Sequence, residues 1–435
     1  MAQRMILAAT MALAAGALIH ATTTAAAQGL TKAGPRVALV EGAKRHPIVA
    51  RQTSSPLPLS PGVFLVPFNG TATVNSTVIN APRFQLVDSS FARQGDSRVL
   101  TTVSSSSFAE NSGARLANGK TQVVTSVFTA NTMNEVFGFS INPDGTPIEE
   151  GVRLTRSKDG NQGGPTVVPM KGGTSFTMWL DGFHEAGESD TSVRGVFGST
   201  DGLPAGDDFL IESKNTGQQS PADGAQLRNG RLLLVWRDLT NSDITGRWLF
   251  RGRLMSRTGK LIGRPFLLGA SNTAVEMRVA ALPNGNFVAV WLDDRSGSSL
   301  PYYRIFSPKG EPLAGPQLLG SSQAELGNRL DVAALSDSSF VIAGNLTEGG
   351  QSRFIAQLFT SAGQKVGAPL VLHTSGNPEG VAEHHIANAG YLLGQAPPVG
   401  GIDSASDARR VYVVWRINRA GGLYDLFGQV LRTKL

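Results

Sequence analysis

The chain has 435 residues, a formal net charge of +6, 17% charged residues, 51 glycines and no cysteine. The lack of cysteine excludes disulfides and thiolate chemistry. The small charge, with no cluster of Lys or Arg interleaved with aromatic residues, argues against nucleic-acid binding. Frequent glycine, serine, threonine and valine favour short strands joined by tight turns over helices.

Residues 1–27 have the three parts of a secretory signal peptide. Residues 1–4 include a positive charge, residues 5–19 are apolar and uncharged, and residues 25–27 are three alanines that fit an A-x-A cleavage site. The apolar run is shorter than the about 20 residues needed to cross a bilayer, and every later apolar run is interrupted sooner. We therefore expect export to the periplasm or the medium, a mature chain beginning at Gln28, and no membrane span.

Residues 28–80 follow the predicted cleavage site and carry several basic side chains near prolines, among them Lys32, Arg36 and Arg51. Such a composition is typical of a flexible arm or linker. The sequence thus predicts three parts: a signal peptide at 1–27, an arm at 28–80 and one domain at 81–435.

A turn marker repeats through the predicted domain. Five dipeptides lie between apolar runs: Asn118-Gly119, Gly172-Gly173, Asn229-Gly230, Asn284-Gly285 and Asp337-Ser338. Their second positions are 54, 57, 55 and 53 residues apart (119, 173, 230, 285, 338). Asn-Gly between apolar runs predicts a β-hairpin with a type I′ turn.

A second marker keeps the same period. Glycines at the next turn are 57, 57, 51 and 53 residues apart: Gly145, Gly202, Gly259, Gly310 and Gly363. Two markers with one period indicate a tandem repeat of a little over fifty residues.

Each repeat predicts four strands, A to D, and three of them align well. Strand B is expected at 123–128, 176–180, 232–236, 287–291 and 340–343. Strand C is expected at 136–141, 193–197, 248–254, 303–306 and 354–359, and strand D at 152–154, 209–211, 266–268, 317–319 and 370–372. Trp179, Trp236 and Trp291 share one position in strand B, which we interpret as packing between neighbouring sheets.

Tandem four-stranded antiparallel units of this length predict an all-β fold, a β-propeller. An open β-solenoid is the alternative, but its strands are usually parallel, whereas hairpin turns require antiparallel pairing. The layout resembles the propeller repeats of exported bacterial proteins over about residues 81–435. The resemblance implies an architecture but no activity, because the sialidase Ser-x-Asp-x-Gly-x-Thr-Trp box and the WD40, NHL and quinoprotein patterns are absent.

The two ends of the domain predict how the ring closes. The last unit has strands at 411–415 and 424–431 and then ends without a fourth. Residues 81–87 (APRFQLV) resemble the strand-D segments at 263–268 and 315–319. We expect residues 84–87 to complete the last blade and hide two sheet edges. This gives six blades, or seven if residues 98–108 contribute to another.

The loops between strands B and C, and between D and the next A, are long and differ between repeats, so we expect the ligand-binding face there. The candidate ligand-binding residues are Asp181, His184, Glu185, Asp238, Asp293, Arg295 and His384. Their carboxylates suit a hard cation such as calcium, or an acid–base pair acting on a glycosidic bond. The simpler alternative is that each Asp caps its own loop.

Three functions remain open at this stage. The first is a binding propeller that recognises a protein or a glycan, and the second is a polysaccharide hydrolase or lyase that uses carboxylates of the B–C loops. The third is a structural subunit of an envelope assembly. No specific catalytic motif is present, so we expect no cofactor beyond a possible divalent cation, and a monomer.

Overall fold

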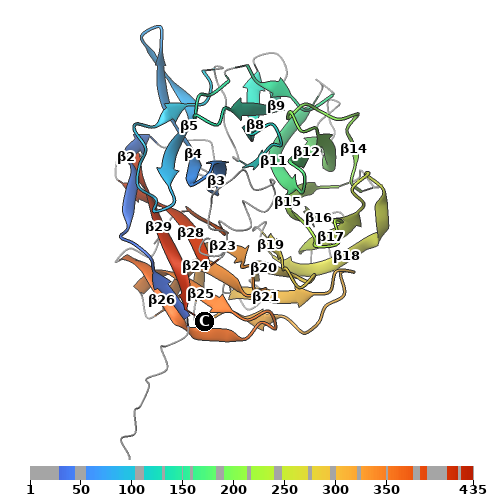
Figure 1. Ribbon diagram of the computed structural model, residues 1–435. Coiled ribbons are helices and arrows are strands. Elements are labelled where there is room, and N and C mark those ends of the chain that lie inside the picture. Colours follow the sequence, from blue (N-terminus) through green and yellow to red (C-terminus); the bar gives the residue numbers. More distant parts are fainter. Residues whose placement is uncertain are drawn as a thin grey trace, which may run out of the picture.

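The computed structural model describes residues 29–44, 55–102, 112–129, 133–148, 150–156, 160–182, 191–212, 217–239, 247–272, 277–293, 300–320, 325–348, 351–375, 383–388, 409–419 and 423–434. These residues form seven antiparallel sheets and no helix. The sheets follow one another around a ring, in chain order from blue to red (Figure 1). The protein is a seven-bladed β-propeller, as the repeat predicted with seven as the higher count.

The first three blades each consist of four consecutive strands, from the innermost outward. Blade 1 contains β3 (Leu57–Ser60), β4 (Val63–Val74), β5 (Thr77–Asp88) and β6 (Arg98–Val99). Blade 2 contains β7 (Ser112–Arg115), β8 (Thr121–Thr129), β9 (Met133–Ile141) and β10 (Val152–Arg153). Blade 3 contains β11 (Asn161–Met170), β12 (Thr174–Gly182), β13 (Thr191–Gly198) and β14 (Phe209–Leu210).

The next three blades repeat this order. Blade 4 contains β15 (Gln219–Gln226), β16 (Leu232–Asp238), β17 (Trp248–Met255) and β18 (Leu261–Ser271). Blade 5 contains β19 (Met277–Ala281), β20 (Phe287–Asp293), β21 (Leu300–Phe306) and β22 (Gln317–Leu318). Blade 6 contains β23 (Glu325–Ala334), β24 (Phe340–Glu348), β25 (Gln351–Phe359) and β26 (Lys365–Ser375).

Blade 7 joins the two ends of the chain. Its inner strands are β27 (Glu383–Asn388), β28 (Arg410–Arg419) and β29 (Leu423–Lys434). Its outer edge is formed by β1 (Gly29–Lys32) and β2 (Val37–Lys44), which both pair antiparallel with β29. An N-terminal strand therefore closes the ring, as expected.

The particular closing strand was predicted wrongly. Residues 84–87 lie in β5 as the third strand of blade 1, where they pair with β4 and β6. The predicted arm also differs from the structure, because strands β1 to β4 and the start of β5 lie within residues 28–80 and belong to the propeller. The predicted signal peptide at 1–27 lies outside the described residues.

Blade 1 was not predicted from the sequence, because its two turns hold different residues from those of the other blades. Gly62 has a φ of 71° at the first turn, 57 residues before Gly119, but it follows proline rather than asparagine. At the second turn the left-handed position is held by Phe91, with a φ of 67°, 54 residues before Gly145. Phe91 is fully buried and its ring lies 5.2 Å from that of Tyr412. We infer that packing against blade 7 compensates for the backbone strain of a non-glycine residue.

The repeating turns are confirmed in position but not in type. The Gly119 amide donates to Leu116 O (3.1 Å), and the Leu116 amide donates to Lys120 O (2.8 Å). Only Gly119 of the Asn118-Gly119 pair has a positive φ, 83°. This is a three-residue loop with a glycine bulge, not a type I′ turn. A turn with positive φ at both central residues occurs instead at Asn75 (47°) and Ser76 (64°), between β4 and β5.

The cores lie between blades, which explains the repeated tryptophan. Trp236 of blade 4 packs with Val168 and Met178 of blade 3. Trp291 of blade 5 packs in the same way on Leu233 of blade 4. The predicted role of these residues in packing between sheets is therefore confirmed, and it means that no blade has a complete core of its own.

Candidate functional site

The two rims of the ring are built differently. On one rim, the turns between strands A and B and between strands C and D bond to the neighbouring blade. Arg98 donates to Gly145 O (2.6 Å), and the Tyr303 hydroxyl donates to Gly363 O (2.8 Å). The Ala117 amide donates to Gly173 O (3.1 Å). These groups hold neighbouring blades together, so this rim has a structural role.

The opposite rim carries the B–C and D–A connections, where ligand-binding residues were predicted. His184, Glu185 and Arg295 lie outside the described residues. The backbone of His384 lies in β27 and pairs with Trp415 of β28. Their assignment to a ligand site stays a prediction.

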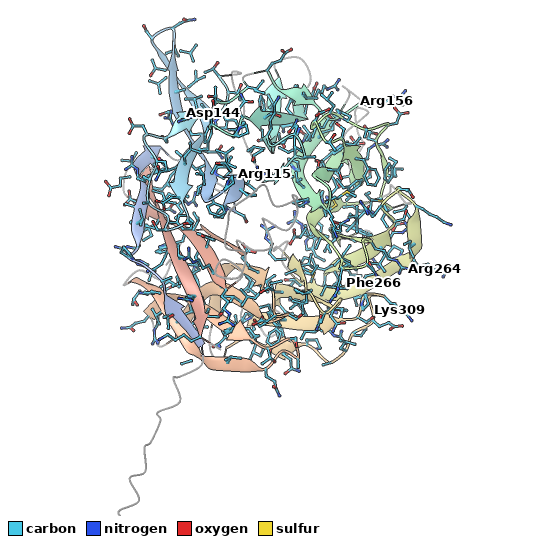
Figure 2. The ribbon with its side chains drawn as sticks, viewed as in Figure 1. Arg115, Asp144, Arg156, Arg264, Phe266 and Lys309 are labelled. Atoms are coloured by element: carbon cyan, nitrogen blue, oxygen red, sulfur yellow. The ribbon has the colours of Figure 1, made fainter. Side chains whose placement is uncertain are left out.

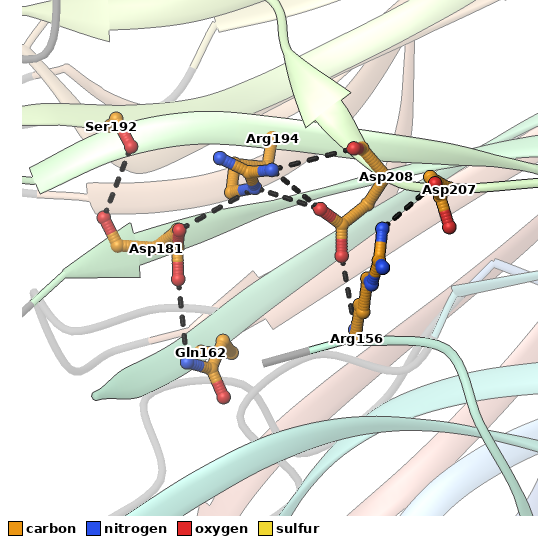
Figure 3. Close-up of polar contacts among 7 residues, drawn as sticks. All are labelled: Arg156, Gln162, Asp181, Ser192, Arg194, Asp207 and Asp208. Carbon is orange, nitrogen blue, oxygen red and sulfur yellow. Dashed lines mark hydrogen bonds and ion pairs between the residues drawn. The ribbon is translucent and has the colours of Figure 1, made fainter. Parts of the chain in front are cut away.

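Asp181 lies near the end of strand β12, just before the B–C loop of blade 3, and is buried. The residue is 4% exposed, and its Oδ2 lies 3.6 Å from Arg194 Nε on the adjacent strand β13. Arg194 also forms an ion pair of 2.6 Å with Asp208, and Gln162 donates to Asp181 Oδ1 at 3.3 Å. Figure 3 shows this network, which links three strands of one blade. It holds the base of the B–C loop in place.

Asp238 occupies the equivalent position in blade 4. It is 1% exposed, and its Oδ2 accepts a hydrogen bond of 2.6 Å from Arg251 Nε on β17. Asp293, in blade 5, is 2% exposed. The equivalent positions are thus equivalent in burial as well. Asp181 and Asp238 each form an ion pair with an arginine of the adjacent strand, and the predicted capping of their own loops stays a prediction.

A different group of charged residues lies on the innermost strands. Asp223 of β15 accepts a hydrogen bond of 2.8 Å from the Val279 amide on β19, and its other oxygen accepts one of 2.8 Å from the Gly224 amide. Arg278 of β19 donates to Ala222 O at 3.3 Å. Each inner strand has one edge that no strand covers, so these side chains satisfy edge groups of the neighbouring blade.

Burial raises the pKa of the Asp223 carboxyl from 3.8 to about 6, although Arg278 and the two backbone amides oppose that rise. Asp331 on β23 raises it further by repulsion. This cluster was not predicted, because Asp223 lies within the strand-A region, which carries no repeated marker in the sequence. The segment Gln219–Gln226 (QSPADGAQ) is rich in polar and small residues and contains a proline and a glycine, so no local pattern predicted a strand or a charged cluster there.

Arg115 plays the same part between blades 1 and 2. It is 8% exposed on β7 and donates to Leu59 O on β3. In Figure 2 it lies toward the centre of the ring, whereas Arg156, Arg264 and Lys309 lie at its outer margin. Charged groups near the axis thus bond to backbone, and the outer ones face solvent.

Within the part of the chain that the structure describes, no group of three or more His, Cys, Asp or Glu residues is arranged to hold a metal ion. The divalent cation stays a prediction. Within the same residues no helix is long and apolar enough to cross a membrane.

No protein-family model and no curated protein matches the sequence. Among solved structures, polysaccharide lyase Uly1 is similar over 92% of this chain and 100% of its own, with 9% identity and a TM-score of 0.56. An ulvan lyase is similar over 90% of this chain and 95% of its own, with 9% identity and a TM-score of 0.50. A protein of unknown function from Dyadobacter fermentans is similar over 93% of this chain and 100% of its own, with 13% identity and a TM-score of 0.48. At these identities the likeness is one of fold: the chain is a β-propeller without a shown family.

Proposed function

We propose that this protein is an exported binding propeller that recognises a glycan, with a protein ligand as the alternative, through its B–C and D–A loops. The observation that carries the proposal is the difference between the rims. On one rim the turns are bonded to the neighbouring blade, and on the other the loop bases are held by buried Asp–Arg pairs. A rigid base beneath variable loops is the usual setting of a binding site.

The test uses the first B–C loop, because the buried Asp238 cannot be changed without disturbing Arg251. Wild type and the variant His184→Gln/Glu185→Gln are applied to a glycan array, and the affinity for any glycan found is then measured by calorimetry. We expect the variant to bind about tenfold more weakly, a loss of about 1.4 kcal/mol.

The matched control is Glu311→Gln, an exposed residue in the C–D connection of blade 5 on the structural rim. It should bind like the wild type. Wild type that binds no glycan would remove the glycan proposal, and a protein ligand would then be sought by cross-linking. Equal loss in both variants would show that the effect does not come from the proposed face.

A polysaccharide lyase or hydrolase is the second candidate. Its support is the fold shared with two polysaccharide lyases. Incubation with acidic polysaccharides, followed by ultraviolet absorbance for unsaturated uronate ends and by reducing-end assay, tests both reactions. Turnover that His184→Gln/Glu185→Gln abolishes would replace the binding proposal by catalysis.

Export is part of the proposal. The first described residue, Gly29, already lies in β1, close behind the predicted cleavage site at Ala27. N-terminal sequencing of protein from the periplasm or medium should give Gln28 or a neighbouring residue. Soluble cytoplasmic protein that retains residues 1–27 would contradict export.

A further inference from the structure

The hairpin of β4 and β5 extends beyond its blade. The two strands pair without a register shift from Val63↔Asp88 to Val74↔Thr77. Their neighbours cover only the base, since β3 pairs with β4 only at residues 63–65 and β6 pairs with β5 only at Arg83 and Phe84. Figure 1 shows the hairpin reaching outside the ring. Among the described strands, residues 70–81 therefore have no partner other than each other.

The base of the hairpin is held firmly. Arg83 donates to Thr71 O (2.8 Å) and to Ser97 O (2.7 Å), which ties both strands to the segment before β6. Gly70 makes this possible, because a Cβ there would lie 2.7 Å from Arg83 Cδ. The Tyr424 hydroxyl of blade 7 donates to Asn69 O. The hairpin is thus a preformed projection.

The free edges lack the usual protection against pairing. Natural edge strands carry charges, prolines or bulges that discourage another strand from adding. Residues 57–82 contain no Asp, Glu, Lys or Arg, and residues 68–81 contain no proline. Val78 is 61% exposed, the highest value among the large hydrophobic residues that the structure describes.

We propose that a second copy of this chain pairs antiparallel along the free edge of β5, forming a two-fold symmetric dimer. A two-fold contact brings the same segment of both copies together, so a charged side chain in it would lie close to a like charge and be repelled. The absence of charge over residues 57–82 removes that repulsion, and it gives an acidic or basic partner nothing to pair with. The β4 edge is less open, because Thr71 O is already bonded to Arg83.

The dimer replaces the monomer expected from the sequence. A ribbon edge of this length buries little area, so the association is weak and depends on concentration. Sedimentation velocity over a concentration series should show wild type moving from monomer to dimer. Wild type that stays monomeric at the highest concentration overturns the proposal.

Two substitutions at one position test the contact. In a two-residue hairpin the pair flanking the turn, Val74 and Thr77, exchanges both backbone bonds, so the Val78 amide points outward. Val78→Pro removes an outward donor and leaves the hairpin bonds intact. Val78→Lys places two like charges in the contact. Both variants should remain monomeric at concentrations where wild type is dimeric.

Val371→Lys is the matched control, since Val371 is an exposed valine (37%) on β26, away from the hairpin. It should dimerise like wild type. Thr73→Pro, on the β4 edge, should dimerise too, and loss of the dimer in Thr73→Pro but not in Val78→Pro overturns pairing through β5. Thermal unfolding within a few degrees of wild type shows that each variant is folded.

Discussion

Blade 4 and blade 7 are both antiparallel sheets around the same ring, but they draw their strands from the chain in different ways. All four strands of blade 4 come from residues 219–271, and each pairs with the next. In blade 7, β1 and β2 pair with β29 across almost the whole sequence; Thr31 Oγ1, for example, donates to Arg432 O, 401 residues away. Blade 4 can form locally, whereas blade 7 requires both ends of the chain, and long-range pairing is the slower and costlier step.

The N-terminal strand β2 nevertheless contributes to a buried core, as the strands of blade 4 do. Leu39 of β2 is fully buried against Phe64 and Phe68 of blade 1, just as Leu233 of β16 is fully buried in blade 4. Ring closure by β2 therefore completes the apolar core between blade 7 and blade 1. Its loss should therefore affect the whole ring.

The largest effect is expected from removing β1 and β2. Deletion of residues 29–44 removes the buried side chains of Leu30 and Leu39 and exposes the edge of β29. Truncating one buried leucine lowers the free energy of unfolding by about 2–5 kcal/mol. The total free energy of unfolding of a typical domain is only about 5–15 kcal/mol. We expect aggregation or loss of the cooperative transition in calorimetry. A variant that unfolds like wild type would show that the seam contributes little.

A smaller, local effect is expected inside blade 4. Arg251→Ala leaves the carboxylate of Asp238 buried without its 2.6 Å partner, which costs about 3–5 kcal/mol. Urea denaturation measures the loss. Lys260→Ala, on the exposed C–D turn of the same blade, is the control and should stay within about 0.5 kcal/mol. A small loss for Arg251→Ala would mean that solvent reaches the pair.

The seam between blades 4 and 5 should lose stability as pH rises. The pKa of Asp223 is raised to about 6 in the folded state, so between pH 3.8 and about 6 the folded protein retains a proton that the unfolded chain releases. The free energy of unfolding therefore falls across that window and then levels off. Asp223→Asn should flatten this part of the stability curve. An unchanged curve would indicate that the carboxyl titrates normally.

The contact between blade 6 and the N-terminal strands of blade 7 should lose stability as pH falls, and this effect should be the smallest of the four. Burial lowers the pKa of His373 on β26, and the nearby charge of Arg36, between β1 and β2, lowers it further. Below the ordinary value of 6.5 the unfolded chain binds a proton that the folded state resists. Stability is thus full above that pH and falls as pH decreases through it. His373→Gln should remove this acid-side loss, as measured by thermal unfolding from pH 5 to 7.

The sequence by itself determined the repeat and most of the blades. Glycine adopts a positive φ without the steric cost that other residues have. The turns with positive φ can therefore be located in the sequence at Gly145, Gly202, Gly259, Gly310 and Gly363. The shared position of the strand-B tryptophans likewise predicted a seam between sheets. These features depend on local backbone geometry and on the need to bury large apolar side chains, and both are visible in a single segment.

Only the tertiary structure decided which strand closes the ring and which arginines pair with the buried aspartates. Residues 81–87 resemble an outer strand in composition, yet partner choice between strands depends on packing across blades, which no local pattern records. The same applies to the partners of Asp181 and Asp238, because the arginines that pair with them come from adjacent strands. Pairing across strands is a property of the assembled sheet, and for that reason the sequence alone left it open.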